Sequence, residues 1–259
     1  MDSNFSILNQ YFDKILVLSI PRLKERQALV KQRLQGLEFE FFFGVDKQEL
    51  TDTFVARDYH YDKKNSLSIS QYFKPMNRGE IACALSHRKI YQAMVDNDWK
   101  TVLIFEDDVV VSEYFDGLPV CLQQLPANWE LLYLGYIKND QVNFAKRIKQ
   151  GWYQLQARLG LGKMPVSMIS KMLPRNYSPS LYKAGFHDCT HAYAISRPAA
   201  EKLLKAQTPV IYRADNLLSA MIMKGQLNGF ACRHSLFNQE IFTDAFHPSE
   251  VRDGAKISI

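Results

Sequence analysis

The sequence predicts an α/β protein built around a mainly parallel sheet. Short apolar runs typical of buried strands alternate with predicted helices of about ten or more residues, an order that favours a sheet covered by helices on both faces. The composition, 47% hydrophobic and 23% charged, is that of a globular protein. We therefore expect one domain over residues 1–259.

The first predicted elements are a strand, a helix and a second strand. Residues 14–20 (KILVLSI) form an apolar run typical of a buried strand. Pro21 fits the first turn of a helix, which we expect to run to about Gln35 and to end at Gly36. The aromatic run 39–46 is the second strand. Residues 47–78 are polar and predict no regular element.

The remaining elements continue the alternation. A long helix is predicted from Gly79 to about Asn97, because its apolar residues recur on one face. Further strands are expected at 101–105, 131–136, 190–196 and 229–233, and further helices at 113–124, 198–206 and 214–224. In open sheets of this kind, ligands bind outside the carboxyl ends of the strands.

The cysteines and the apolar runs predict an intracellular, cytoplasmic location. The N-terminal residues lack the features of a secretory signal, and no apolar run approaches the roughly 20 residues that span a bilayer. The cysteines are single and widely spaced, which favours reduced thiols over disulfides. They are Cys83, Cys121, Cys189 and Cys232.

Positive charge is concentrated in one segment. Residues 141–187 contain no acid but hold eight Lys and Arg residues, interspersed with Trp, Tyr and Met. Such a mixture binds an anionic surface, either phospholipid headgroups or an acidic glycolipid. A solvated insertion is the alternative reading. In both cases the segment of about 137–186 is expected to be an insertion in the domain.

Three consecutive acids, Glu106, Asp107 and Asp108, follow the strand 101–105. Adjacent carboxylates repel one another and resist burial, so they need hydrogen-bond donors, water or a cation. A hard divalent ion prefers such oxygen ligands, and Mg²⁺ or Mn²⁺ held there can coordinate the phosphates of a nucleotide. The alternative is an acidic turn that caps the following helix, with Asp108 and Glu113 near its positive end.

Matching segments spread over most of the chain resemble glycosyltransferase family 25, which includes bacterial lipooligosaccharide galactosyltransferases and relatives of the collagen galactosyltransferases. The segments are VLSIPRLKER, FFFGVDKQEL, RGEIACALSHRKIY, VLIFEDDV, LLYLG and THAYAISRPAAEKLL, together with the helix of Asp215. The resemblance implies a GT-A (Rossmann-like) fold, a nucleotide-sugar donor and inversion at the anomeric carbon.

The resemblance also gives the acids their expected roles. The EDD run would be the family's form of the DxD motif, with Asp108 and Glu106 as ligands of Mn²⁺ or Mg²⁺ and Asp107 binding hydroxyls of the donor. A late histidine, His234, is the expected third metal ligand. The HDCTH group at 187–191 is a weaker alternative metal site.

Donor-binding residues are expected near the first two strands and the long helix. Ser19, Arg22 and Arg26 follow the first strand, where arginine offers a planar fork of donors to phosphate. Asp46 closes the second strand and can bind uracil or ribose, or simply form a turn. The GEIACALSH motif adds two further candidates, Ser86 and His87; a buried structural histidine is the alternative for the latter.

An inverting transferase needs a general base that removes the proton of the acceptor hydroxyl. Enzymes with a GT-A fold place this acid at the start of a helix on the acceptor side, which matches Asp215 in RADNLLSAMIMKG. A plain helix cap is the alternative for Asp215, and Asp188 is the second candidate for the base.

The predicted function is metal-dependent, inverting transfer of galactose from UDP-galactose to a sugar hydroxyl of a lipooligosaccharide or lipopolysaccharide core. The basic insertion would then meet the anionic acceptor as a peripheral protein at the inner face of the membrane. Two alternatives stay open: a phosphohydrolase of nucleotide sugars and a non-catalytic carbohydrate-binding protein. No nucleic-acid partner is expected.

Overall fold

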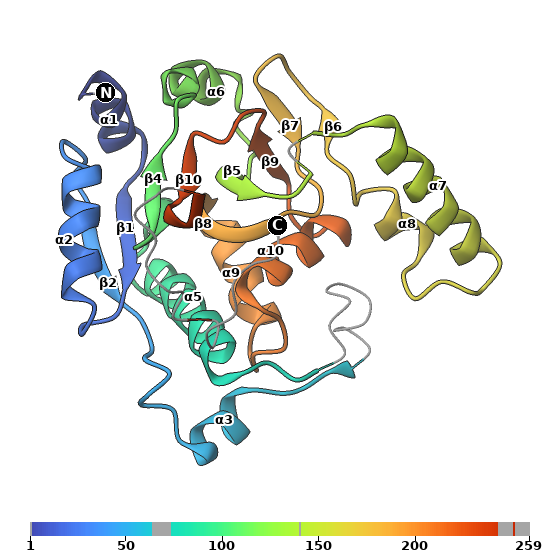
Figure 1. Ribbon diagram of the computed structural model, residues 1–259, viewed down its shortest axis with the longest axis horizontal. Helices are drawn as coiled ribbons and strands as arrows, with labels where there is room; N and C mark the ends of the chain where they lie inside the picture. The colour runs from blue at the N-terminus through green and yellow to red at the C-terminus, as the bar shows by residue number, and fades with distance from the viewer. Residues whose placement is uncertain (1, 64–73, 140, 243–250, 252–259) are drawn as a thin grey trace.

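The computed structural model describes residues 2–63, 74–139, 141–242 and 251 of the chain. Its described strands form one large sheet and one small one (Figure 1). The large sheet consists of β1 (Lys14–Ser19), β2 (Glu40–Phe43), β3 (Thr101–Glu106), β5 (Leu131–Ile137), β6 (Arg175–Asn176), β7 (Leu181–Lys183), β8 (Asp188–Ser196) and β9 (Gly229–Cys232). The small sheet pairs β4 (Val109–Val111) with β10 (Phe237–Gln239). The α/β class predicted from the sequence is confirmed.

The eight strands of the large sheet follow the order β2-β1-β3-β8-β5-β9-β7-β6. β1 runs parallel to β2 and β3, and β5 runs parallel to β9. β8 lies antiparallel between β3 and β5, so the sheet is mixed at its centre. As a result, the carboxyl ends of β1, β2, β3, β5 and β9 and the start of β8 share one edge, which we call the site edge.

Helices cover both faces of this sheet, as the alternating pattern predicts. α5 (Arg78–Asp96), α9 (Arg197–Ala206) and α10 (Ala214–Met223) pack against one face through a core that includes Tyr91, Leu203 and Leu217. α1 (Asp2–Tyr11), α2 (Lys24–Arg33) and α6 (Leu118–Gln124) pack against the other face, as Figure 1 shows. Adjacent residues of a strand point to opposite faces of the sheet. In β1, Leu16 packs in the core beneath α5, α9 and α10, and Val17 packs in the core beneath α1, α2 and α6, which we call the second core.

α5 starts at a capping box, which fixes the position of the GEIACALSH motif. The Asn77 side chain accepts a hydrogen bond from the Glu80 amide at 2.8 Å, and the Glu80 carboxylate accepts one from the Asn77 amide at 2.9 Å. Arg213, just before α10, donates to the same Glu80 carboxylate at 2.6 Å. The starts of α5 and α10 are therefore tied together.

Several elements differ from the sequence prediction. α1 was not expected, and it forms because Phe5 and Leu8 are buried against the second core. A short helix, α3 (Asp52–Asp58), lies within the segment predicted to be irregular, whose residues 64–73 are outside the described part. The helix expected from about 113 starts later, with a 3-10 turn at Phe115–Gly117 followed by α6. The first predicted helix likewise starts at Lys24 rather than Pro21.

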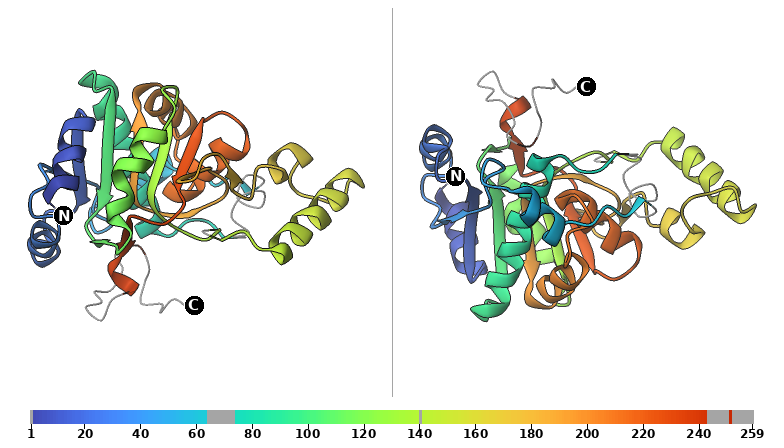
Figure 2. Two further views of the ribbon diagram at one scale, coloured as in Figure 1. Left: turned by 90° about the horizontal axis from the view of Figure 1, so that it is seen from above. Right: turned by 90° about the horizontal axis from the view of Figure 1, so that it is seen from below.

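The helices of the basic segment, α7 (Phe144–Arg158) and α8 (Val166–Ile169), project from the body of the molecule (Figure 2) and pack against each other. The strands β6 and β7 of the same segment form one edge of the large sheet. Within the part of the chain that the structure describes, no helix combines the length and apolar character needed to cross a bilayer.

Candidate functional site

The three acids lie at the site edge, where the main chain leaves β3 and enters β4. Because a strand and not a helix follows Asp108, these acids do not cap a helix, and the capping alternative is wrong. Each carboxylate has different neighbours, and these neighbours set its charge.

Glu106 is held by residues from α5 and β8. Its Oε1 accepts a hydrogen bond from the Thr190 hydroxyl and lies 3.4 Å from His87 Nε2. The other ring nitrogen of His87 is hydrogen bonded to the Tyr193 hydroxyl at 2.8 Å. Burial raises the pKa of Glu106, but the His87 and Thr190 contacts outweigh this effect, so its pKa is lowered and the carboxylate stays charged.

Asp107 lies on the β1 side of the site edge and is almost fully paired. The Ser19 hydroxyl donates a hydrogen bond to Oδ2 at 2.6 Å, and Arg26 NH1 lies 3.0 Å from Oδ1. Ser19 is buried and only 12% of the Arg26 side chain is exposed, so these contacts are poorly screened by water.

Asp108 is the least compensated of the three acids. Its Oδ2 lies 3.6 Å from Arg26 NH2 and accepts a long hydrogen bond of 3.4 Å from Gln239. Its Oδ1 is buried and has no hydrogen-bond partner. Burial and the neighbouring Glu106 charge raise the pKa of Asp108 to about 7, although Arg26 opposes the shift. Such a group gains strongly from a bound cation.

Arg22 and Asp46 pair with each other. Arg22 Nε and NH2 donate to the Asp46 carboxylate at 2.5 and 3.3 Å, and the Gln48 amide donates to it at 3.0 Å. The Arg22 contact, acting against burial, lowers the pKa of Asp46. Asp46 thus combines the predicted turn with an ion pair that orients Arg22.

Ser86 joins α5 to the end of β2. Its hydroxyl accepts a hydrogen bond from the Val45 amide at 2.8 Å and donates to the Ala82 carbonyl at 2.7 Å. A Cβ at Gly44 would lie 2.4 Å from the Ser86 oxygen, so only glycine allows this close approach. Ser86 is buried, and in this structure it contacts the main chain of the site edge.

Asp215 lies at the same edge, as the second residue of α10. The residue before the helix, Arg213, takes the N-cap position, so Asp215 is not a plain cap. Its carboxylate accepts hydrogen bonds from the amides of Cys189, at 3.2 Å, and Asn216, at 2.7 Å. Burial and the charge of Asp188 raise the pKa of Asp215 to about 6.

Asp188, the second candidate base, opens β8 and is 34% exposed. Lys138 Nζ lies 3.2 Å from its Oδ2. The next residue, Cys189, has a positive φ of 70°, an uncommon backbone conformation for a residue with a side chain. This turn points the Cys189 amide toward Asp215 and places both aspartates at the start of β8.

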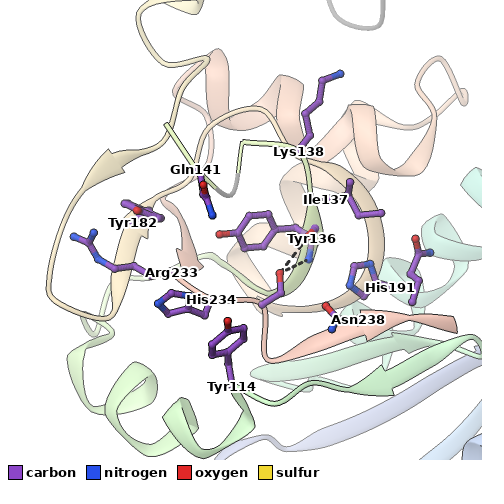
Figure 3. Close-up of a pocket in the computed structure, with 12 residues that line it drawn as sticks. Tyr114, Tyr136, Ile137, Lys138, Gln141, Tyr182, His191, Arg233, His234 and Asn238 are labelled. Atoms are coloured by element: carbon purple, nitrogen blue, oxygen red, sulfur yellow. Dashed lines mark hydrogen bonds between the residues drawn. The ribbon is translucent and has the colours of Figure 1, made fainter. Parts of the chain in front are cut away.

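A pocket of ≈ 480 Å³ adjoins the acids on the β5–β9 side, and Gln239 connects it to Asp108. Figure 3 shows His234 beside Tyr114 on one wall and His191 across the pocket. The rings of His234 and Tyr114 stack with centroids 4.7 Å apart. Aromatic faces and polar side chains together suit a polar ligand with an apolar face, such as a sugar.

Metal-ligand atoms cluster at one point in the described part of the chain. One ligand atom each from Cys83, His87 and Glu106 lie within 4.8 Å of one another. The predicted set of Glu106, Asp108 and His234 does not form such a group among the described residues.

The HDCTH histidines do not form a site together. His187 Nδ1 is hydrogen bonded to the Lys138 carbonyl at 3.0 Å, whereas His191 Nε2 is hydrogen bonded to the Phe237 carbonyl at 3.0 Å. They therefore stabilise separate parts of the backbone.

Sequence reasoning missed Thr190 and Tyr193, which position Glu106 and His87. Both lie in the THAYAIS segment, predicted only as a strand. Strand alternation gave no signal for the pair, because Thr190 and Tyr193 are three residues apart in β8 and a regular strand would place them on opposite faces, yet Thr190 contacts Glu106 and Tyr193 contacts His87.

The fold and this edge together define an α/β protein with a carboxylate-rich site outside its strand ends. The model of glycosyltransferase family 25 (LPS biosynthesis protein) matches residues 12–218. The chain therefore belongs to glycosyltransferase family 25.

Curated relatives include active and inactive proteins by name. Procollagen galactosyltransferase 2 of Mus musculus is 26% identical over 201 residues, which cover 75% of this chain and 28% of the relative. Inactive glycosyltransferase 25 family member 3 of Homo sapiens is 28% identical over 202 residues, covering 76% and 29%. The alignments with these two relatives thus span less than a third of the relatives' length.

Two solved glycosyltransferases align with most of the chain at low similarity. The galactosyltransferase LgtC, in complex with donor and acceptor sugar analogs, is 11% identical with a TM-score of 0.38, covering 87% of this chain and 86% of that one. Mouse xyloside xylosyltransferase 1 is 10% identical with a TM-score of 0.34, covering 88% and 71%. Both TM-scores fall below the level at which a common fold is established.

Proposed function

We propose that this chain is a metal-dependent, inverting glycosyltransferase that moves galactose from UDP-galactose to a sugar hydroxyl of a lipooligosaccharide or lipopolysaccharide core. The observation that carries the proposal is the carboxylate of Asp108 at the site edge, whose Oδ1 is buried without a hydrogen-bond partner and whose charge is opposed by Glu106 and only partly offset by Arg26. Membership of glycosyltransferase family 25 supports the reaction class.

The residues at the site edge fit a hard divalent cation. Asp108 offers an oxygen that is buried and lacks a hydrogen-bond partner, and Glu106 stays charged beside it. Carboxylate oxygens of this kind suit Mn²⁺ or Mg²⁺. A bound ion would neutralise the diphosphate of the leaving nucleotide. His234, which stacks on Tyr114 and does not group with these two acids in the described part of the chain, is left out of the proposed ligand set.

The β1 side of the site edge is assigned to the donor. Arg26 and Ser19 hold Asp107, which is proposed to bind hydroxyls of the ribose or the sugar. Arg22, oriented by Asp46, supplies cationic N–H groups for phosphate or a planar face for the base. Ser86 and His87 contact the Val45 amide and the Glu106 carboxylate, and we assign them to holding these two groups in place.

Asp215 is the proposed general base. Its two backbone hydrogen bonds fix the orientation of the carboxylate, and a pKa of about 6 leaves it mostly ionised at neutral pH. As the acceptor oxygen bonds to the anomeric carbon, its proton passes to Asp215. The bond from that carbon to the diphosphate oxygen breaks, and its electron pair leaves with UDP. Asp188, paired with Lys138, is the second candidate.

The acceptor is assigned to the aromatic pocket. Tyr114 and His234 stack there, and Lys138 and Arg233 add positive charge that suits an anionic oligosaccharide. A lipooligosaccharide core is such an acceptor, and we place the reaction at the cytoplasmic face of the membrane where a lipid-anchored acceptor can be reached.

Two alternatives predict different products. Some relatives are inactive by name, which favours testing a non-catalytic sugar-binding protein as the rival. A phosphohydrolase that cleaves nucleotide sugars is the other. The experiment is a screen of UDP-sugars against a small panel of oligosaccharide acceptors with Mn²⁺ and detection by mass.

The proposal expects a product heavier than the acceptor by one hexose, strongest with UDP-galactose and absent without acceptor. Free sugar released at the same rate with and without acceptor would establish the phosphohydrolase. Sugar binding without any product would establish the non-catalytic protein.

A further inference from the structure

α7 carries a continuous apolar stripe on an exposed surface. Five large apolar side chains of α7 and its C-terminal cap are 46–78% exposed. Successive residues turn by about 100° around a helix, so these five positions fall within about 80° of one another. They are Phe144, Ile148, Trp152, Leu155 and Leu159. None of the α7 residues is buried, although the helix is 15 residues long.

The opposite face of α7 is directed toward the rest of the insertion. α7 packs on α8, and the Gln150 side chain donates a hydrogen bond to the Ile169 carbonyl at 2.6 Å. Tyr153, on the same face, is half-buried. The packing within the insertion therefore uses the polar face and leaves the apolar stripe outward.

Cations flank the stripe on both sides. With about 100° per residue, Arg147 and Arg158 project beside one border and Lys149 beside the other. All three residues are exposed. No acid occurs between residues 141 and 187, so nothing in the segment neutralises them. An apolar stripe bordered by Lys and Arg is the pattern of a helix that lies in the headgroup region of a membrane.

The positive charges beside the stripe decide which kind of partner suits this face of α7. A second copy of the chain would bring one acid-free cationic segment against another, which like-charge repulsion opposes. A nucleic acid would pair with the cations but leave Ile148, Trp152 and Leu155 in water. A bilayer with anionic lipids supplies both an apolar layer and negative charge.

The chain reaches α7 directly from the pocket. Ile137, Lys138 and Gln141 line the pocket, and α7 begins at Phe144. Figure 2 shows α7 at the far end of the projecting segment in both views. A membrane-seated α7 would thus tether the pocket to the membrane surface through the few residues between Gln141 and Phe144.

We infer that α7 is an in-plane docking helix that inserts the stripe of Phe144, Ile148, Trp152, Leu155 and Leu159 into a bilayer rich in anionic lipid. The inference rests on the proposed function for its biological setting, because a lipid-anchored anionic acceptor lies at that surface. The docking itself requires no nucleotide, metal or turnover.

The test measures binding of the full chain to vesicles by flotation, with neutral vesicles and with vesicles holding about 30% anionic lipid. Wild-type protein is expected to bind the anionic vesicles at least about 10-fold more tightly than the neutral ones. A stripe variant, Ile148→Gln, Trp152→Gln and Leu155→Gln, keeps good helix formers and should lose binding by about 10-fold or more.

The matched control replaces an exposed apolar residue elsewhere. Val120→Gln on α6 removes a side chain that is 43% exposed and should leave vesicle binding unchanged. A charge variant, Arg147→Gln, Lys149→Gln and Arg158→Gln, should lose at least about 10-fold and most of the salt dependence. Its control is Lys24→Gln, Lys89→Gln and Lys205→Gln, three exposed lysines outside the insertion.

Tryptophan fluorescence reports whether the stripe enters the apolar layer of the vesicle. Trp152 is 57% exposed, so its emission should shift to shorter wavelength when vesicles are added. Trp152→Phe keeps an apolar side chain and should bind while losing that shift.

Vesicle binding that is equal in wild type and the stripe variant, or absent in wild type, would overturn the inference. A concentration-dependent dimer that only the stripe variant loses would assign the face to a second copy instead. The stripe variant should keep full turnover on a soluble acceptor. Vesicle binding without any turnover would end the proposed function and leave the docking helix standing.

Discussion

The two sides of the site edge differ in how their carboxylates are paired with positive charge. On the β1–β2 side, Asp46 pairs with Arg22 and Asp107 pairs with Ser19 and Arg26. On the β3–α10 side, Asp108 and Asp215 are half-buried beside other acids, and their pKa values rise to about 7 and about 6. The acids of the first side are paired within the protein. On the second side Arg26 only partly offsets the negative charge, so that side favours a bound cation and a transferred proton.

The largest effect is expected from Asp108→Asn. We expect loss of metal-dependent donor binding and a fall in transfer of about 10³-fold or more, because a bound ion contributes several kcal/mol of charge stabilisation. Steady-state kinetics with UDP-galactose measures it.

Asp46→Asn is the control from the paired side. It should raise KM by about 10- to 100-fold through a less ordered Arg22, because a hydrogen bond to a charged group contributes about 1.5–3 kcal/mol. Equal losses of transfer activity in Asp46→Asn and Asp108→Asn would contradict the distinction between the two sides of the site edge.

Asp215→Asn should reduce transfer by about 10²- to 10⁴-fold, the range expected for loss of a general base. Donor binding should stay within about 2-fold of wild type, since Asn has the same shape and Asp215 is proposed to act on the acceptor, although the amide oxygen can accept only one of the two hydrogen bonds from Cys189 and Asn216. Asp188→Asn is the matched variant, and its kcat should change far less. A fully active Asp215→Asn protein would move the base to Asp188.

The pH dependence should report Asp215. Its carboxyl has a pKa of about 6, so the basic form disappears as the pH falls below that value. We expect kcat/KM to drop about tenfold per unit below pH 6 and to level off above pH 7. The residual activity of Asp215→Asn should lack this limb; retention of the limb in that variant would assign it to another group.

The stability of the metal-free protein should change in opposite directions on the two sides. The pKa of Asp108 is raised, so the folded state binds the proton more tightly and loses stability as the pH rises from about 4 to about 7. Asp108→Asn should therefore stabilise the protein at pH 8 by about 1–4 kcal/mol and much less at pH 4.

Asp46 should behave in the opposite way. Arg22 lowers its pKa, so this ion pair adds stability above pH 4 that is lost in acid. Asp46→Asn should lower the free energy of unfolding at pH 8 by about 0.5–1.5 kcal/mol, reduced because Arg22 is partly exposed. Denaturant unfolding with a chelator present measures both variants. If both substitutions changed the free energy of unfolding at pH 8 in the same direction, the contrast between the two sides of the site edge would be contradicted.

Much of the site edge follows from local sequence. The apolar runs that end at Ser19 and Glu106 are buried strands, and parallel pairing brings their ends together. The apolar stripe of α5 was predicted from local sequence as well, whereas its capping box at Asn77 was not predicted although the sequence there has the Asn-x-x-Glu pattern. Strand-end residues are predictable because strand period and direction decide where they lie.

Other contacts depend on pairing across long distances in the chain. The insertion of β8 antiparallel between β3 and β5 brings Thr190 to Glu106, 84 residues away. The β4–β10 pair, which carries Gln239 to Asp108, joins the three valines of β4 to a partner 126 residues later, Phe237–Gln239, that has little strand signal alone. The sequence predicted only a basic segment where α7 lies. Its apolar stripe became significant when the structure showed that the helix projects from the body and leaves this face exposed.

The most direct test of the central claim is a calorimetric titration of UDP-galactose into the protein with Mn²⁺ and, separately, with a chelator. The account predicts saturable binding with Mn²⁺ that weakens at least about 10-fold without it, and no such metal dependence in Asp108→Asn. Binding of equal strength with and without metal, or no binding of any UDP-sugar, would contradict it.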